Sequence, residues 1–238
     1  MQAARRRKHL DALGIETWVR RGAPDAAVTP GVAAAAEERQ PVPAPAAAAP
    51  AVPSDWTGLR AAVKACTGCR LRAGCTQTVF GVGPEQAPLM VVGEGPGADE
   101  DAQGEPFVGR AGKLLDEMLR AIGRSRRTDT YIANVVKCRP PNNREPAADE
   151  AEACRAYLEQ QLRLVKPKLI VALGRVAAQR LLVTDAPLSK LRGAMHRWGP
   201  ENTPLMVTYH PAYLLRSPGE KAKSWEDLKK VHKFLNAP

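Results

Sequence analysis

The sequence of 238 residues lacks any apolar run long enough to cross a membrane. It also lacks a secretory signal, because the basic residues Arg5 to Lys8 are not followed by a continuous apolar core. No internal repeat is present. These absences argue against a membrane-spanning or secreted protein, and we expect a soluble cytoplasmic one, associated with the nucleoid if the source is bacterial.

Large apolar side chains are nearly absent from residues 22–54, which consist mostly of Ala, Pro and Val. Such a segment cannot bury enough surface to offset its conformational entropy, and its prolines favour extended backbone. We therefore predict a disordered linker over 22–54. Residues 1–21 combine basic side chains with the apolar spacing of a short amphipathic helix. We expect that segment to tether DNA or to dock on a replication or repair protein.

Positive charge is in excess throughout the chain, with a formal net charge of +10. From Ser54 onward there are still 28 Lys and Arg residues against 20 Asp and Glu. A basic surface favours a polyanionic partner such as nucleic acid, although a solvated basic face would give the same count.

Four short runs rich in Val, Ile and Leu have the length of buried strands. The runs are Pro88–Val92, Thr130–Ala133, Lys168–Leu173 and Pro204–Tyr209. Helix-like stretches separate them, so residues 55–238 are predicted to form an α/β domain, a three-layer sandwich with a central, mostly parallel four-stranded sheet. Ligands of such sheets bind beyond the carboxyl ends of the strands. We therefore expect one shared rim for the residues that follow the strands, which are Gly93–Gly97, Asn134, Gly174 and His210.

The chain has five cysteines. Cys66 and Cys69 form a C-x-x-C pair, Cys138 follows a predicted strand, and Cys154 lies in the next predicted helix. In a reducing compartment such thiols bind metal more often than they form disulfides. Four thiolates suit zinc or a four-iron cluster, and the wide second spacing departs from a zinc ribbon and favours iron–sulfur. Cys138 and Cys154 could instead be ordinary buried thiols. Cys75 follows Cys69 too closely to be a natural fourth ligand.

Taken together, these residues resemble those of the family-four uracil-DNA glycosylases, the type that carries an iron–sulfur cluster. The resemblance covers Cys66 to about Leu235 and leaves out the first 55 residues. Its motifs, in order, are Cys66-x-x-Cys69, Val79–Gly81, Gly93–Gly97 with Glu100 and Asp101, Gly104–Gly109, Ala111–Leu115, Asn134–Pro141, Cys154, Leu173–Gly174, Leu191–Gly193, His210–Leu215 and Trp225–Leu228. The thiol at Cys75 departs from the family pattern, in which arginine is common.

This resemblance implies roles for three side chains around an extruded uracil. A glycosylase reaches the glycosidic bond only after taking the nucleotide out of the stack, and negative charge then develops on the departing base. His210 would stabilise that charge at uracil O2. Asn134 would read the uracil edge with one donor and one acceptor, a pattern that cytosine reverses. From the sequence alone, Phe107 could equally anchor its polar loop in the core, and the resemblance favours stacking on the base.

Four further residues receive roles from the same resemblance. Glu94 and the backbone of Gly95 would lie beneath the sugar, where a carboxylate favours the cationic sugar and helps to place the attacking water. Some uracil glycosylases carry aspartate where Gly95 stands. Glu100 would exclude the methyl group of thymine. Leu214, four residues after His210, would be the apolar wedge that enters the duplex.

The resemblance also implies a [4Fe-4S] cluster held by Cys66, Cys69, Cys138 and Cys154, with a structural role. We expect it to shape a basic DNA-facing surface that includes Lys137, Arg139 and Arg144. The partner would be uracil-containing DNA, and the protein would act in base excision repair as a monomer.

Two other functions compete with this interpretation. One is a uracil-DNA binding protein that does not turn over or that traps the sugar covalently. Relatives of that kind carry an inserted basic loop with a histidine, whereas this chain runs directly through Gly109–Lys113. The other is a metal-cluster scaffold in a replication complex, which leaves Asn134 and His210 unexplained.

Overall fold

The computed structural model describes residues 52–237. The predicted basic segment 1–21 and nearly all of the linker predicted over 22–54 lie outside these residues. None of the helices described is both long enough and apolar enough to span a bilayer.

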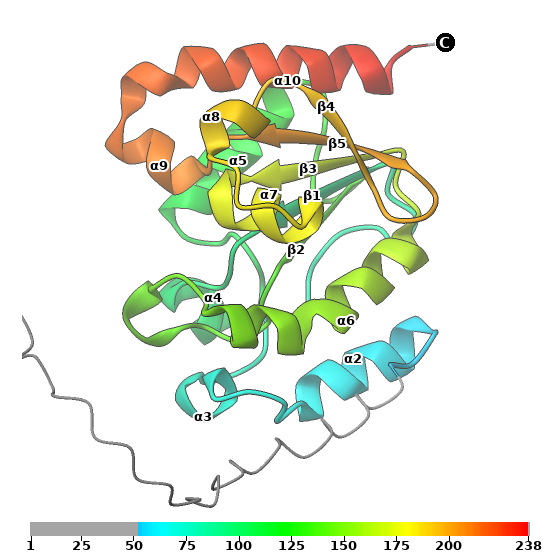
Figure 1. The fold of residues 1–238 in the computed structure, drawn as a ribbon, viewed down its shortest axis with the longest axis vertical. Coiled ribbons are helices and arrows are strands. Elements are labelled where there is room, and N and C mark those ends of the chain that lie inside the picture. Colours follow the sequence, from blue (N-terminus) through cyan, green and yellow to red (C-terminus); the bar gives the residue numbers. More distant parts are fainter. Residues whose placement is uncertain (1–51, 238) are drawn as a thin grey trace, which may run out of the picture. The chain divides into compact units, whose positions relative to one another are not determined.

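The centre of the fold is a five-stranded sheet with the order β2-β1-β3-β5-β4 (Figure 1). Its strands are β1 (Leu89–Gly93), β2 (Thr130–Asn134), β3 (Leu169–Leu173), β4 (Met195–Trp198) and β5 (Thr203–Thr208). The four predicted strands are confirmed as β1, β2, β3 and β5, and they pair in parallel. The predicted count of four was wrong by one, because β4 adds an antiparallel edge strand beside β5. Residues of β4 are half-buried or exposed, so no continuous apolar run marked it.

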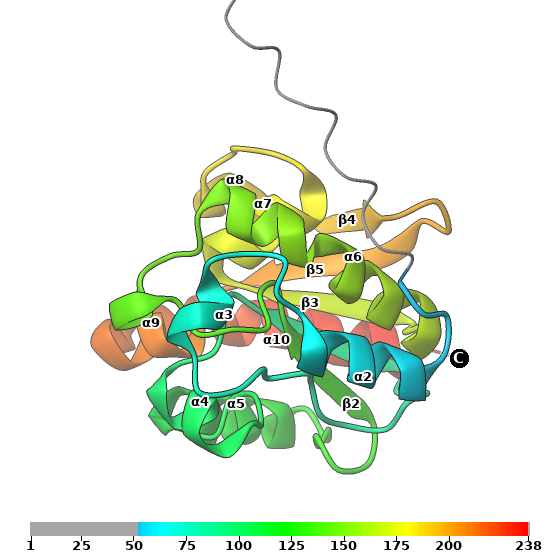
Figure 2. The same cartoon turned by 90° about the horizontal axis from the view of Figure 1, so that it is seen from below.

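Helices cover both faces of the sheet (Figure 2). Alternate strand residues point to opposite faces, so Met90 and Val92 join one apolar cluster and Leu89 and Val91 join the other. The first cluster includes residues of α6 (Ala148–Val165) and α7 (Gly174–Leu182), and α2 (Trp56–Ala65) lies against α6. The second includes residues of α5 (Arg110–Ala121), α9 (Pro211–Arg216) and α10 (Lys221–Leu235). The predicted three-layer architecture is therefore confirmed.

Shorter helical turns complete the described residues. They are α3 (Leu71–Gly74), α4 (Ala98–Gln103), α8 (Leu188–Leu191), η1 (Pro141–Asn143) and η2 (Pro218–Glu220).

The parallel strands end along one rim, where their connecting loops begin. Gly93 at the end of β1 pairs in register with Asn134 at the end of β2. Gly174 follows β3 directly, and His210 lies two residues after β5, at the N-cap of α9. The sheet topology thus gathers residues that are distant in sequence, as expected for a ligand site of this class of sheet.

Candidate active site

A cavity of about 450 Å³ opens at this rim. It is walled by the loops that follow β1 and β2 and by α9 with the residue before it. Six of the seven residues predicted for the reaction or for substrate binding line it, namely Glu94, Gly95, Glu100, Phe107, Asn134 and His210. The seventh, Leu214, does not.

Asn134 presents an unpaired acceptor beside the cavity. The residue is 2% exposed, and its Oδ1 atom is buried with no hydrogen-bond partner among residues 52–237. A Cβ atom added to Gly93 would come within 2.4 Å of this Oδ1 and 2.6 Å of Phe107 Cζ, so only glycine leaves room for both side chains. A buried acceptor without a partner costs about 1–3 kcal/mol. Oδ1 is therefore free to accept a hydrogen bond without losing one within residues 52–237.

Phe107 lies beside the amide, next to Gly93, and has a strained backbone conformation. Its φ of 56° is in the left-handed region, which costs a residue other than glycine about 1–3 kcal/mol. The phenyl ring is 6% exposed, and its centroid lies 5.5 Å from that of the His210 imidazole at an interplanar angle of 34°. Phe107 and His210 therefore form two neighbouring aromatic walls.

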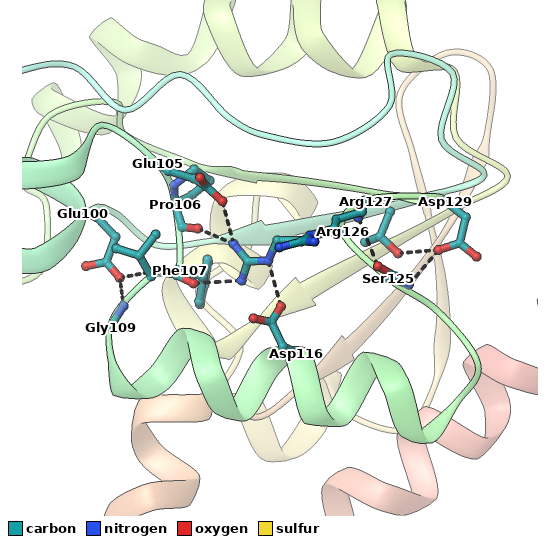
Figure 3. A network of polar contacts seen from close by, with 12 residues as sticks. Glu100, Glu105, Pro106, Phe107, Gly109, Asp116, Ser125, Arg126, Arg127 and Asp129 are labelled. Carbon is teal, nitrogen blue, oxygen red and sulfur yellow. Dashed lines mark hydrogen bonds and ion pairs between the residues drawn. The ribbon is translucent and has the colours of Figure 1, made fainter.

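Glu100 shapes the loop that carries Phe107 (Figure 3). Its Oε1 atom accepts the backbone N–H groups of Val108 at 2.9 Å and Gly109 at 3.0 Å, and its Oε2 atom accepts that of Gly97 at 3.0 Å. The carboxylate lies near the N-terminus of α5, where negative charge is favourable. Glu100 thus holds the loop in place and lines the cavity at the same time.

His210 is held as a neutral imidazole with a defined tautomer. The backbone N–H of Ala212 donates to Nδ1 at 3.2 Å, so in the neutral ring the proton resides on Nε2. Burial lowers the pKa of His210 to about 4, and the charge of Arg216 adds to the shift. The residue therefore caps α9 through one nitrogen and offers an N–H donor through the other.

The carboxyl group of Glu94 has a pKa close to neutral pH. Burial raises its pKa to about 7, and the negative charge of Glu145 raises it further against the opposing effect of Arg175. Glu145 itself is held by Arg175 in an ion pair of 2.5 Å. Next to Glu94, a Cβ atom on Gly95 would lie only 2.8 Å from Val136 Cγ2. An aspartate at position 95 would therefore require this part of the cavity wall to move.

The predicted wedge at Leu214 is wrong for this structure. Leu214 is 1% exposed and packs into the apolar cluster formed with α5 and α10, so it cannot enter a duplex without leaving the core. The preceding residue, Tyr213, is 36% exposed and lines the cavity, with its ring stacked on Tyr209 at 5.1 Å. On α9, Tyr213 thus lines the cavity together with Ala212 and Arg216.

The predicted place of Lys137 on a DNA-facing surface is also wrong. The side chain is 1% exposed, and its Nζ donates to the Asn134 carbonyl at 2.9 Å and to Gln161 Oε1 at 2.6 Å. Burial lowers its pKa to about 8. Lys137 thus braces the end of β2 from inside the protein. Arg139 and Arg144 do reach the surface, and Arg144 lines the cavity.

The four predicted ligand thiols lie in the same region of the fold. Cys138 and Cys154 are buried, and Cys66 and Cys69 are half-buried. The pKa of Cys154 is raised to about 11, mainly by burial and also by the neighbouring thiols of Cys69 and Cys66, against the opposing effect of Lys137. The backbone N–H of Lys137 approaches Cys154 Sγ at 3.4 Å. N–H groups directed at sulfur are among the groups that tune iron–sulfur clusters.

The described residues do not form a site for a single metal ion. Across residues 52–237, no three side chains of Cys, His, Asp or Glu converge closely enough to hold a single metal ion. Thiolates around one tetrahedral zinc would be about 3.8 Å apart, given a Zn–S bond of about 2.3 Å. A cluster of four irons is larger and keeps its four thiolates further apart. Four thiol donors suit an iron–sulfur cluster or zinc.

Three further residues at the site received no individual role from the sequence. Gly93 separates Asn134 from Phe107, Glu145 faces Glu94, and Tyr213 stands at the rim. A glycine at the end of a buried strand signals a close approach of other groups, and that signal could have pointed to Gly93. No local pattern identifies the other two.

Residues 80–229 match the family model described as the uracil DNA glycosylase superfamily. Among curated proteins, the chain is 46% identical over 176 residues to a type-4 uracil-DNA glycosylase of Archaeoglobus fulgidus, covering 71% of this chain and 87% of the relative. It is 44% identical over 178 residues to one of Thermotoga maritima (73% and 91%) and 41% identical over 182 residues to one of Sulfurisphaera tokodaii (74% and 83%). The chain therefore belongs to the uracil-DNA glycosylase superfamily and, within it, to the type-4 uracil-DNA glycosylases.

Proposed function

We propose that this protein hydrolyses the N-glycosidic bond of a flipped-out deoxyuridine in DNA and leaves an abasic site, the first step of base excision repair. The observation that carries this proposal is the buried, unpaired Oδ1 of Asn134 in a cavity shared with Phe107 and His210. A base that enters the cavity from a duplex must first leave the stack.

Asn134 selects uracil by the carbonyl and amino groups of its side-chain amide. Oδ1 accepts the N3–H of uracil, and Nδ2 donates to O4. Cytosine presents an acceptor at N3 and a donor at N4, so both contacts become repulsive. Phe107 supports this selection by stacking on the base, which keeps the edge of the ring facing the amide.

His210 and Glu94 stabilise the two charges that develop as the bond breaks. The neutral Nε2–H of His210 donates to uracil O2 as the base leaves as an anion. Because the pKa of His210 is about 4, the ring stays neutral near pH 7. The Glu94 carboxylate lies on the sugar side, where it favours the cationic sugar and accepts a proton from the attacking water.

A replacement of Glu94 by glutamine tests this assignment through pH. The single-turnover rate of the native protein should rise as pH increases through about 7, because Glu94 acts only when ionised. The Glu94→Gln variant should be slower by at least about 100-fold and should show no such rise. The exposed Glu201→Gln variant, in the turn between β4 and β5, is the matched control. A Gln variant that kept the rise would assign it to another group.

The same replacement should stabilise the protein although it slows the reaction. The folded-state pKa of Glu94 exceeds its ordinary value of 4.5, so the folded protein binds more protons than the unfolded chain between these values. This lowers stability progressively from about pH 4.5 to 7, and the deficit stays constant at higher pH. Glu94→Gln should therefore raise the unfolding midpoint at pH 8 more than at pH 4.5.

One assay tests the function as a whole. The purified protein is incubated with an oligonucleotide that contains a single uracil, and strand breakage is scored after alkali treatment. Uracil-dependent, multiple-turnover breakage supports the proposal. A covalent protein–DNA adduct would favour the trapping alternative. The inserted basic loop of such relatives has no counterpart here, because α5 begins at Arg110 immediately after its N-cap Gly109. Uracil-dependent binding without breakage would favour a non-catalytic binding protein, and the absence of both would favour a scaffold.

We further propose that Cys66, Cys69, Cys138 and Cys154 hold a [4Fe-4S] cluster. When bound, the cluster would supply structural cross-linking between the segment before β1 and the segments around Cys138 and Cys154. Cys75 is left outside the ligand set, and Arg72 Nη1 lies 3.6 Å from its Sγ atom.

This ligand assignment predicts that Cys138→Ala loses iron while Cys75→Ala keeps it. Protein purified without oxygen should contain about four iron atoms per chain and absorb visible light. Cys138→Ala should lose both signals and unfold at a lower temperature, because three thiolates hold the cluster incompletely. If zinc were found instead of iron, or if Cys138→Ala kept the full spectrum, the assignment would be wrong.

A further inference from the structure

Arg126 contacts the loop that carries Phe107 (Figure 3). The residue follows α5, and its side chain is 12% exposed. Its Nη1 donates to the Pro106 carbonyl at 2.9 Å, and its Nη2 donates to the Phe107 carbonyl at 2.8 Å. Its Nε donates to Asp116 Oδ1 at 2.7 Å, which fixes the plane of the guanidinium.

These contacts complement those of Glu100. Glu100 accepts the N–H groups of Val108 and Gly109, just after Phe107, whereas Arg126 donates to the carbonyls of Pro106 and Phe107. The loop is thus held from both sides at the residue with the left-handed φ of 56°. Strained conformations of this kind persist only where the surroundings fix them.

The approach of α5 leaves little freedom on the remaining side. A Cβ atom added to Gly112 would overlap the Phe107 carbonyl oxygen at 1.8 Å, so the helix touches the loop backbone directly. Asp116 lies one turn further along α5 and binds Arg126. Helix, guanidinium and loop therefore form one unit that sets the direction of the Phe107 ring.

We propose that Arg126 is a positioning residue for base stacking: its guanidinium holds Phe107 in the strained backbone conformation that faces the ring toward the bound uracil. The proposal rests on the proposed function, because it assigns Phe107 to the substrate base. Arginine suits this role better than lysine, since its fork addresses two adjacent carbonyls and the carboxylates of Asp116 and Glu105 at the same time.

The test compares Arg126→Leu and Arg126→Lys with Arg124→Leu. Arg124 is a matched control in the same loop, with a side chain 15% exposed and an ion pair to Asp129, and it makes no contact with Phe107 among the described hydrogen bonds. We expect Arg126→Leu to lower kcat/KM on uracil-containing DNA by up to about 100-fold, as misplacement by about 1 Å can do. Inhibition by free uracil should weaken in parallel. The kcat/KM of Arg126→Lys should lie between those of Arg126→Leu and the native protein. The unfolding midpoint of Arg126→Leu should match that of Arg124→Leu.

A double-mutant cycle separates positioning from a general loss of structure. In a Phe107→Ala background, Arg126→Leu should cost less than about threefold, because there is no ring left to position. An equal loss in both backgrounds would overturn the proposal, and so would native activity in Arg126→Leu. If Arg126→Leu does not fold, Arg126→Lys and Asp116→Asn go through the same cycle and decide by the same criterion.

The outcomes also separate this proposal from the proposed function. If the native protein neither cleaves uracil-containing DNA nor binds free uracil, the proposed function fails. If the native protein does both and the Arg126 variants behave as Arg124→Leu does, the function stands and only the role of Arg126 is lost.

Discussion

Replacing Asn134 by leucine should abolish uracil excision and at the same time stabilise the protein. Leucine has nearly the shape of asparagine but offers no hydrogen bond to the N3 and O4 groups of uracil. Sites built to pair such groups lose about 10⁴-fold or more when the pairing is missing, because buried polar groups of the substrate are left unsatisfied. We expect a loss of this size in kcat/KM.

The gain in stability has a separate cause. Oδ1 of Asn134 is buried without a partner, and its removal relieves the cost of its desolvation. The unfolding midpoint of Asn134→Leu should therefore be at least as high as that of the native protein. Melting curves with and without free uracil measure both effects, since only the native protein should be stabilised by the ligand. A fall in the midpoint without ligand would show that the amide is structural and would contradict its assignment to the base.

The His210→Asn variant should slow the chemical step by about 100- to 1,000-fold, the usual cost of one lost oxyanion donor. Asparagine is chosen because it also caps helices well, so the N-cap of α9 that Nδ1 now provides is kept. DNA binding and thermal stability should stay close to native. The matched control is His196→Asn on β4, a half-buried histidine that contacts the Leu191 carbonyl and lies outside the cavity.

The pH dependence tests whether the imidazole acts in its neutral form. With the pKa of His210 at about 4, its protonation does not change between pH 5 and 9. Once Glu94 is replaced by glutamine, the residual rate should therefore be flat over this range. A residual rate that climbed as pH fell from 8 to 5, and lost that climb in His210→Asn, would mean that the imidazolium is the active form.

The sheet could be predicted because its signal is local. Val, Ile and Leu in runs of about five residues identify buried parallel strands, and the burial of every residue in β1, β2 and β3 agrees. Edge strand β4 was missed for the same reason, since its residues are partly exposed and carry no such run.

Errors at Leu214 and Lys137 arose where local sequence cannot distinguish inside from outside. The short helix α9 has apolar residues on several sides, and only its packing on α5 and α10 decides that Leu214 faces the core and Tyr213 the cavity. Lysine is usually exposed, yet Lys137 is buried because Gln161 Oε1 and the Asn134 carbonyl accept hydrogen bonds from its ammonium group. Both environments are built by residues that are remote in sequence.

The sequence by itself determined the four parallel strands and the helices between them, and it placed Glu94, Asn134 and His210 at the ends of strands, because each depends on short motifs. Tertiary structure alone decided which groups face the cavity, the unpaired state of Asn134 Oδ1, the neutral tautomer of His210 and the bracing of Phe107 by Arg126. Exposure, pKa and hydrogen-bond partners are set by neighbours that the fold brings together from separate strands and loops, and no local pattern encodes them.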